Sequence, residues 1–247
     1  MTGALFNRME AIESFAADVA HELKNPLTSL RSAVETLPLA KTEEAKTRLT
    51  RIIHHDIKRL DRLISDISNA SRLDAELARQ DATPVDCRQV LTTIVNIART
   101  TTAADGPEIK LDIAPGKPDA YFVLGHDGRV GQVFTNLIDN ARSFCRKDGV
   151  VRIIMRRKAD TLEIMVEDDG PGIRVDQFER IFERFYTDRP EQEAFGQNSG
   201  LGLSITKQIV EAHQGRVTAE NRTRSAAKPG EPPIVLGARF IVVLPAA

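Results

Sequence analysis

Two long amphipathic stripes constrain the first third of the chain. From Leu5 to Leu37, apolar residues recur every three or four positions, which predicts one long helix. Pro26 is the only interruption inside this pattern, and Pro38 ends it. A second stripe over residues 49–67 predicts an antiparallel partner helix. Because two helices cannot bury both stripes between them, we expect two hairpins to pair as a four-helix bundle in a homodimer.

Composition excludes several classes of protein. The 34 Lys and Arg residues nearly balance the 35 Asp and Glu residues, so the chain lacks the basic surface of a nucleic-acid-binding protein. The two cysteines show no CxxC spacing, which predicts neither a disulfide framework nor a zinc site. No segment approaches the roughly 18 consecutive apolar residues of a membrane helix. We therefore expect membrane contact only through segments outside this chain.

The sequence predicts two domains. The helical stripes end near residue 74, and the pattern decays over residues 75–84, where we place a linker. The second domain, residues 85–247, mixes helical and alternating patterns. Its predicted helices are 87–99, 127–144 with Asp127 as N-cap, and 201–212; its predicted strands are 109–113, 121–124, 151–155, 162–166 and 235–244. The expected fold class is α+β, a helical hairpin followed by an α/β sandwich.

His21 points away from the first apolar stripe. At about 100° per residue it lies on the solvent face, where a lone histidine is usually ordinary surface. Here Glu22 is adjacent, and Lys24 and Asn25 share the face of His21. A neutral imidazole is a nucleophile, and the Glu22 carboxylate could hold Nδ1–H so that Nε2 attacks.

The second domain carries polar and glycine-rich segments suited to a nucleotide. It has no GxxxxGK[ST] motif, which argues against a P-loop fold. Asn136 and Asn140 lie one turn apart on a predicted helix, where an amide oxygen can bind Mg²⁺. Asp168 follows a predicted strand and could accept a hydrogen bond from an adenine amino group. Taken alone, these residues also suit a surface helix and a simple turn.

Glycines accompany these side chains. Gly170 and Gly172 would let the backbone approach a base closely. Gly200 and Gly202 begin a predicted helix, whose free N–H groups favour phosphate. The intervening segment TDRPEQEAFGQN is polar and aperiodic, as lids are.

Five motifs in a fixed order resemble those of two-component sensor histidine kinases. FAADVAHELKNPLTSL is similar to the phosphoacceptor box. NLIDNA, DDGPGI, FERFY and NSGLGLSI are similar to the N, G1, F and G2 boxes. The resemblance covers nearly the whole chain and implies the ATP-binding fold shared with Hsp90, gyrase B and MutL.

The resemblance implies a role for each matching residue. His21 would be phosphorylated, Glu22 would be the orienting base, and Asn25 would position water in a phosphatase reaction. Asn140 would bind Mg²⁺, and Asp168 would accept from adenine. The residues that support or shape the ATP site would be Asn136, Gly170, Gly172, Gly200 and Gly202.

The chain departs from the family pattern at two positions. Ser143 stands where many members carry Lys or Arg for a phosphate contact, and Arg142, Arg146 or Arg184 could replace it. Asn198 stands at the usual first glycine of the G2 box. Neither departure removes a residue essential to the implied chemistry.

The histidine box also resembles the ChvG/ExoS group of alphaproteobacterial sensor kinases. That resemblance implies a cytoplasmic core of a parent anchored in the bacterial inner membrane, signalling to the receiver domain of an OmpR-type response regulator. Two alternatives stay open: a phosphatase-dominant protein and a dimeric scaffold that holds nucleotide with little turnover. A pure ATPase would leave the face around His21 unexplained.

Overall fold

The computed structural model describes residues 2–77, 82–186, 200–225 and 233–247. The chain divides into two units, one containing residues 1–72 and 184–201 and the other residues 73–183 and 202–247. Within the described ranges, no helix combines the length and apolarity needed to cross a bilayer.

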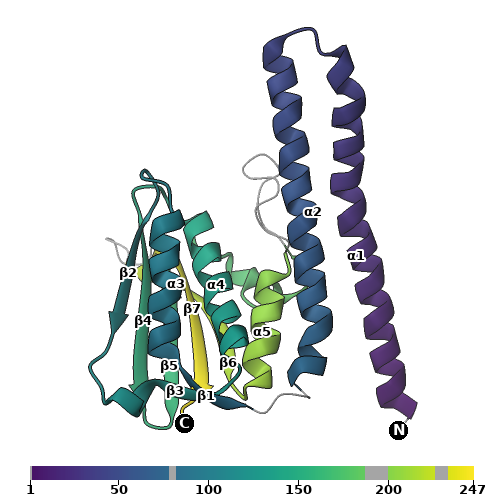
Figure 1. Ribbon diagram of the computed structural model, residues 1–247. Helices are drawn as coiled ribbons and strands as arrows, with labels where there is room; N and C mark the ends of the chain where they lie inside the picture. The colour runs from purple at the N-terminus through teal and green to yellow at the C-terminus, as the bar shows by residue number, and fades with distance from the viewer. Residues whose placement is uncertain (1, 78–81, 187–199, 226–232) are drawn as a thin grey trace. The chain divides into compact units, whose positions relative to one another are not determined.

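The first unit contains a helical hairpin. It consists of α1 (Thr2–Thr36), the short 3-10 helix η1 (Leu37–Leu39) and α2 (Glu43–Leu77) (Figure 1). The predicted helices and the turn at Pro38 are confirmed. α1 continues through Pro26, which has no N–H, so the carbonyl of Glu22 lacks its usual helical donor.

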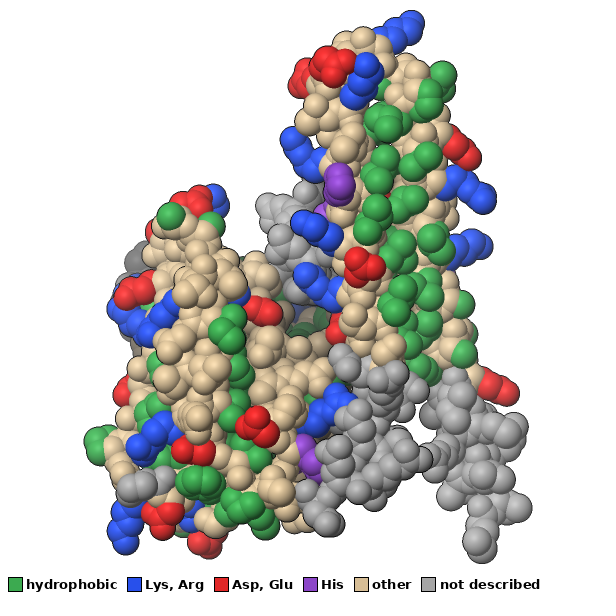
Figure 2. Space-filling model, in the orientation of Figure 1, with side chains coloured by type: hydrophobic (Ala, Val, Ile, Leu, Met, Phe, Trp, Pro, Cys, Tyr) green, Lys and Arg blue, Asp and Glu red, His purple; other side chains and the backbone are tan. Residues whose placement is uncertain are grey.

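Apolar side chains of both helices remain exposed in a single hairpin. Ala33 and Leu63 are buried, but four large apolar residues are between 43% and 55% exposed: Leu27, Val34, Ile57 and Ile64. Figure 2 shows apolar side chains running along the hairpin. All four belong to the apolar stripes read from the sequence. Their exposure shows that one hairpin alone does not bury these stripes completely.

The second unit is built on a five-stranded mixed sheet in the order β2-β4-β5-β7-β6. The strands are β2 (Glu108–Ile113), β4 (Val150–Lys158), β5 (Thr161–Glu167), β6 (Arg216–Arg224) and β7 (Ile234–Pro245). β2 runs parallel to β4, and the other neighbours are antiparallel. Three helices cover the sheet: α3 (Cys87–Thr101), α4 (Asp127–Phe144) and α5 (Gly202–Ala212) (Figure 1). The α/β sandwich is confirmed.

The core lies between the sheet and the helices. Alternate residues of β4 and β5 are fully buried, namely Val151, Ile153, Met155, Leu162, Ile164 and Val166. They share the interior with Phe134 and Leu137 of α4. This alternation is the period-two pattern of the sequence, with one face buried and the other polar.

Three local predictions differ from the structure. The N-cap of α4 is His126, and Asp127 is already the first helical residue. The short strands β1 (Thr83–Asp86) and β3 (Phe122–Gly125) pair with each other, and β1 was not predicted because Pro84 is typical of a break. β6 was also missed, because as an edge strand it buries few apolar residues.

The predicted linker over residues 75–84 overlaps two of these elements. α2 continues to Leu77, and β1 begins at Thr83. The segment AELARQ, read as decaying periodicity, consists mostly of good helix formers, which explains why the helix extends into it.

Candidate functional site

His21 and its neighbours occupy the exposed side of α1. His21, Lys24 and Asn25 are exposed, and Glu22 is half-buried. Asn25 follows His21 by one helical turn, so their side chains lie on the same face. The structure therefore presents an imidazole, a carboxylate and an amide close together at the helix surface.

Glu22 is engaged across the hairpin by an arginine that the sequence analysis missed. Its Oε2 accepts a hydrogen bond from Nη2 of Arg59 on α2 at 3.1 Å. Among the described residues, no hydrogen bond joins Glu22 to His21. Arg59 thus holds the carboxylate of Glu22 toward α2. To act as a base toward His21, Glu22 would have to share or leave this ion pair.

Asn136 and Asn140 lie one turn apart on α4. Nδ2 of Asn136 donates to the carbonyl of Gly202 at 3.0 Å and lies 3.4 Å from Thr206 Oγ1, which ties α4 to the start of α5. Asn140 is half-buried, and its carbonyl accepts from Ser143 Oγ at 2.8 Å. The side-chain amide of Asn140 offers an oxygen, which is the kind of ligand atom that Mg²⁺ prefers.

Asp168 follows directly after β5 and is only 2% exposed. Its Oδ1 accepts from the backbone N–H of Gly170 at 2.8 Å and of Ala238 at 3.2 Å. Within the described part of the chain, Oδ2 has no hydrogen-bond partner. Burial raises the pKa of Asp168, while these backbone donors and the charge of Arg222 oppose that rise. The geometry leaves one carboxylate oxygen available to an external donor.

The loop after Asp168 requires glycines. A Cβ at Gly170 would lie 2.7 Å from the carbonyl oxygen of Phe144. Gly172 has φ +79°, a conformation that side chains rarely adopt. Asn221 of β6, missed in the sequence, anchors the same loop by bonding both backbone polar groups of Ile173, at 2.7 and 2.6 Å. The loop is held in one shape by contacts that substitution would disturb.

The other two glycines differ in how far the structure constrains them. Gly200 has φ +72°, and a Cβ there would lie 2.8 Å from Cα of Phe185. Gly202 begins α5, and a Cβ there would make only ordinary contacts. The backbone N–H of Phe185 donates to the carbonyl of Gly200 at 2.9 Å. Arg184 is exposed. The predicted lid and Asn198 lie outside the described residues.

The two other arginines that could replace a phosphate contact at Ser143 differ in how firmly they are held. Arg142 is bound to Asp139 at 3.0 Å. Arg146 lies 3.9 Å from Asp148, and its side chain is 71% exposed. Arg146 is therefore the more loosely held of the two.

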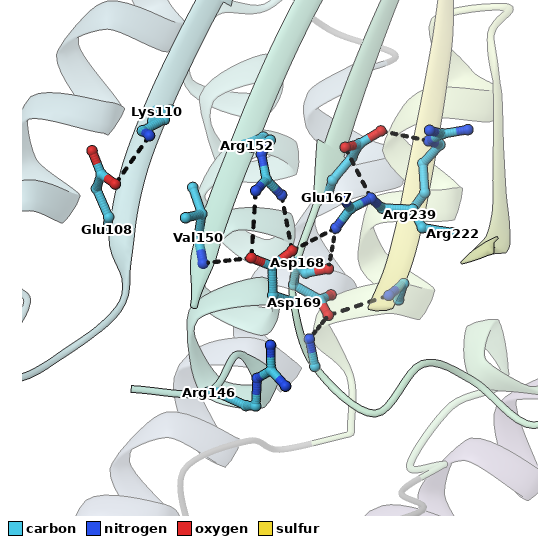
Figure 3. Close-up of polar contacts among 12 residues, drawn as sticks. Glu108, Lys110, Arg146, Val150, Arg152, Glu167, Asp168, Asp169, Arg222 and Arg239 are labelled. Carbon is cyan, nitrogen blue, oxygen red and sulfur yellow. Dashed lines mark hydrogen bonds and ion pairs between the residues drawn. The ribbon is translucent and has the colours of Figure 1, made fainter. Parts of the chain in front are cut away.

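A cluster of two carboxylates and three arginines surrounds the backbone of Asp168 (Figure 3). We call it the carboxylate–arginine cluster; its members are Arg152, Glu167, Asp169, Arg222 and Arg239. Asp169 also accepts from the N–H of Val150 at 2.9 Å. Burial opposes its ionisation, but hydrogen bonds from Arg152 and Arg222 outweigh burial and lower the pKa of Asp169 to about 2.

Gly237 of β7 permits a close approach of this strand to Asp168. It has φ +151°, and a Cβ at this position would lie 1.8 Å from the carbonyl oxygen of Asp168. We expect Gly237→Ala to destabilise the chain by about 3 kcal/mol, because backbone must shift to relieve the overlap. Urea unfolding would measure the loss. Gly128→Ala is the matched control, since its Cβ would meet nothing within 4 Å; an unchanged midpoint for Gly237→Ala would contradict the role.

Two family models match the chain. Residues 11–76 match the His Kinase A (phospho-acceptor) domain, and residues 125–247 match the Histidine kinase-, DNA gyrase B-, and HSP90-like ATPase family. The chain belongs to the sensor histidine kinases. The resemblance read from its five motifs is thus confirmed at the level of both domains.

Relatives of this histidine kinase core support the same assignment. Sensor protein ChvG of Agrobacterium fabrum is 57% identical to this chain. The alignment covers 100% of this chain and 41% of that protein. The chain thus spans about two fifths of that relative. The structure of full-length ShkA in complex with AMPPNP is 25% identical, with a TM-score of 0.62 over 94% of this chain and 45% of that one.

A third comparison concerns the fold alone. Histidine kinase ThkA, in complex with response regulator protein TrrA, is 21% identical. Its TM-score is 0.73, and the match covers 98% of this chain and 64% of that one. The order of hairpin and sandwich is therefore shared with a solved histidine kinase.

Proposed function

We propose that this sensor histidine kinase core uses Mg²⁺ and ATP to phosphorylate His21 and then passes the phosphoryl group to an aspartate of a response regulator. The observation that carries the proposal is Asp168, a buried carboxylate with one oxygen held by two backbone N–H groups and the other left for a donor. The same chain exposes an imidazole beside a carboxylate on α1.

The residues of the second unit fit a purine nucleotide. Oδ2 of Asp168 would accept from the adenine amino group, and the missing side chain of Gly170 lets the loop backbone lie against the carbonyl of Phe144 and Oδ1 of Asp168. Asn140 would hold Mg²⁺, which when bound neutralises charge on the phosphates. Asn136 supports this arrangement through its bond to Gly202.

His21 would act as the nucleophile. The lone pair of Nε2 forms a bond to the γ-phosphorus as the bond from that phosphorus to the bridging oxygen breaks, and ADP leaves with that oxygen. The imidazole then carries a proton on Nδ1, which passes to Glu22 or to solvent. Orientation of Nδ1–H by Glu22 keeps Nε2 unprotonated before attack.

A second copy of the chain is the proposed partner of the hairpin. The exposed apolar residues Leu27, Val34, Ile57 and Ile64 lie on both helices. A two-fold pairing would bury the same stripe on each copy and complete a four-helix bundle. This supports the homodimer expected from the sequence.

The proposed phosphoryl acceptor is a receiver domain, of the OmpR type. A response regulator is bound to ThkA in the solved complex, which supports a partner of that class. We also propose that the chain is the cytoplasmic core of a longer, membrane-anchored parent. Its match to 41% of Sensor protein ChvG supports a longer parent.

The chemical stability of the product tests the kinase proposal. We expect protein incubated with γ-labelled ATP and Mg²⁺ to acquire label that is lost in acid and retained in alkali, as a phosphorus–nitrogen bond requires. Acid-stable label, or no label despite measured ATP binding, would contradict the proposal. The second result would instead favour the nucleotide-binding scaffold.

The exposed amide of Asn25 favours a second activity, removal of the phosphoryl group from the regulator. Asn25 lies one turn beyond His21, where it could orient a water molecule. We expect Asn25→Ala to slow dephosphorylation of the regulator about tenfold or more while autophosphorylation continues. Ser29→Ala, at an exposed position one turn further on, should change neither rate. A wild-type phosphatase rate in Asn25→Ala would show that Asn25 does not orient the water molecule.

A further inference from the structure

Arg222 reaches the end of β5 from a strand that is not its neighbour. β7 lies between β5 and β6, and Arg222 of β6 is opposite Gly237 of β7. The register of the two strands shifts immediately after Arg222. Because Gly237 has no side chain, the carbonyl group of Asp168 can lie against β7, where the arginine contacts it.

One guanidinium binds three consecutive residues. Nη1 of Arg222 donates to the carbonyl oxygen of Asp168 at 2.8 Å and to Oδ1 of Asp169 at 2.7 Å. Its Nε lies 3.1 Å from Oε2 of Glu167. The Arg222 side chain is only 16% exposed, so these contacts are largely shielded from water. Such a bridge requires the rigid fork of a guanidinium, which lysine lacks.

We propose that Arg222 is a positioning residue for recognition of the adenine base. By binding the carbonyl of Asp168 and the carboxylates on both sides of it, Arg222 sets the direction in which Asp168 presents Oδ2. The inference rests on the proposed role of Asp168 as adenine acceptor, and it adds a second residue to that recognition.

The other arginines of the carboxylate–arginine cluster do not make this contact. Arg152 of β4 binds Asp169, and Arg239 of β7 binds Glu167 and Glu220. Among the described residues, Arg222 is the only arginine whose side chain bonds to Asp168. Arg152 is therefore a matched control, because it contacts the same carboxylate, Asp169, and leaves the Asp168 carbonyl untouched.

A double-mutant cycle on the full chain separates positioning from general stabilisation. Affinity for Mg²⁺-ATP would be measured by calorimetry for wild type, Arg222→Met, Asp168→Asn and the double variant. We expect Arg222→Met to weaken ATP binding about tenfold in the wild-type background and less than twofold in the Asp168→Asn background. Arg152→Met should weaken it less than threefold.

Inosine triphosphate provides a readout that a merely structural role would not give. It lacks the amino group that Asp168 would accept, so Arg222→Met should leave its affinity within twofold of wild type. Arg222→Lys retains the charge without the fork, and we expect ATP affinity between those of wild type and Arg222→Met. This milder variant carries the test if Arg222→Met does not fold.

Three results would overturn the inference. They differ in whether the proposed role of Asp168 as adenine acceptor is retained. Equal loss of ATP and inosine triphosphate affinity would make Arg222 a general support of the fold. Wild-type ATP affinity in both Arg222 variants, with a loss in Asp168→Asn, would overturn the role of Arg222 and retain that of Asp168. Unchanged ATP affinity in Asp168→Asn would remove the proposed adenine acceptor together with the inference.

Discussion

His21→Gln should reduce incorporation of phosphoryl from ATP by about 100-fold or more. Glutamine resembles histidine in size and polarity but lacks a ring nitrogen with a nucleophilic lone pair. The side chain is exposed on α1, so its replacement should change the free energy of unfolding by less than about 0.5 kcal/mol. ATP affinity should also be retained, because Asn140, Asp168, Gly170 and Gly172 belong to the other unit. Radiolabelling and calorimetry on the same preparation would separate the two effects.

His54 offers a matched control for this variant. It is an exposed histidine on α2, the other helix of the hairpin. We expect His54→Gln to incorporate label at the wild-type rate. Wild-type labelling of His21→Gln, or loss of label in His54→Gln alone, would show that the assigned acceptor is wrong.

Asp168→Asn should weaken ATP binding about 100-fold. An amide group is close to a carboxylate in shape but places a donor at one of its two positions. If that NH₂ occupies the Oδ1 position, it opposes the N–H groups of Gly170 and Ala238. If it occupies the Oδ2 position, it opposes the amino group of adenine. Either orientation leaves a buried donor unpaired, which accounts for the size of the expected loss.

The expected loss can be measured by calorimetric titration with Mg²⁺-ATP. Asp160→Asn is the matched control, because Asp160 lies exposed in the turn between β4 and β5. It should bind ATP as the wild type does. Asp168→Asn binding within threefold of wild type would contradict the assignment of Asp168 as the base acceptor.

Features with a local periodic signal could be predicted from the sequence. The end of α4 at Phe144 was read correctly and its start differs by one residue, because its apolar stripe is regular. The alternation in β4 and β5 identified their buried residues, because it reflects one buried face. The exposure of His21 followed from its position relative to the stripe.

Contacts between distant segments could not be predicted in the same way. The carboxylate–arginine cluster draws its members from β4, β6, β7 and the end of β5, and its pairing depends on strand order and register. Glu22 and Arg59 meet only because the hairpin closes with one particular alignment. Gly237 offered a sequence signal, since a glycine inside an otherwise apolar strand often marks a close backbone approach.

The site of phosphorylation is the most direct test of the central claim. Protein incubated with ATP and Mg²⁺ would be digested at alkaline pH, where a phosphorus–nitrogen bond survives, and the peptides would be sequenced by mass spectrometry. Our account predicts one phosphoryl group on the imidazole of His21. A phosphoryl group on His54, His55 or a hydroxyl side chain, with His21 unmodified, would contradict it.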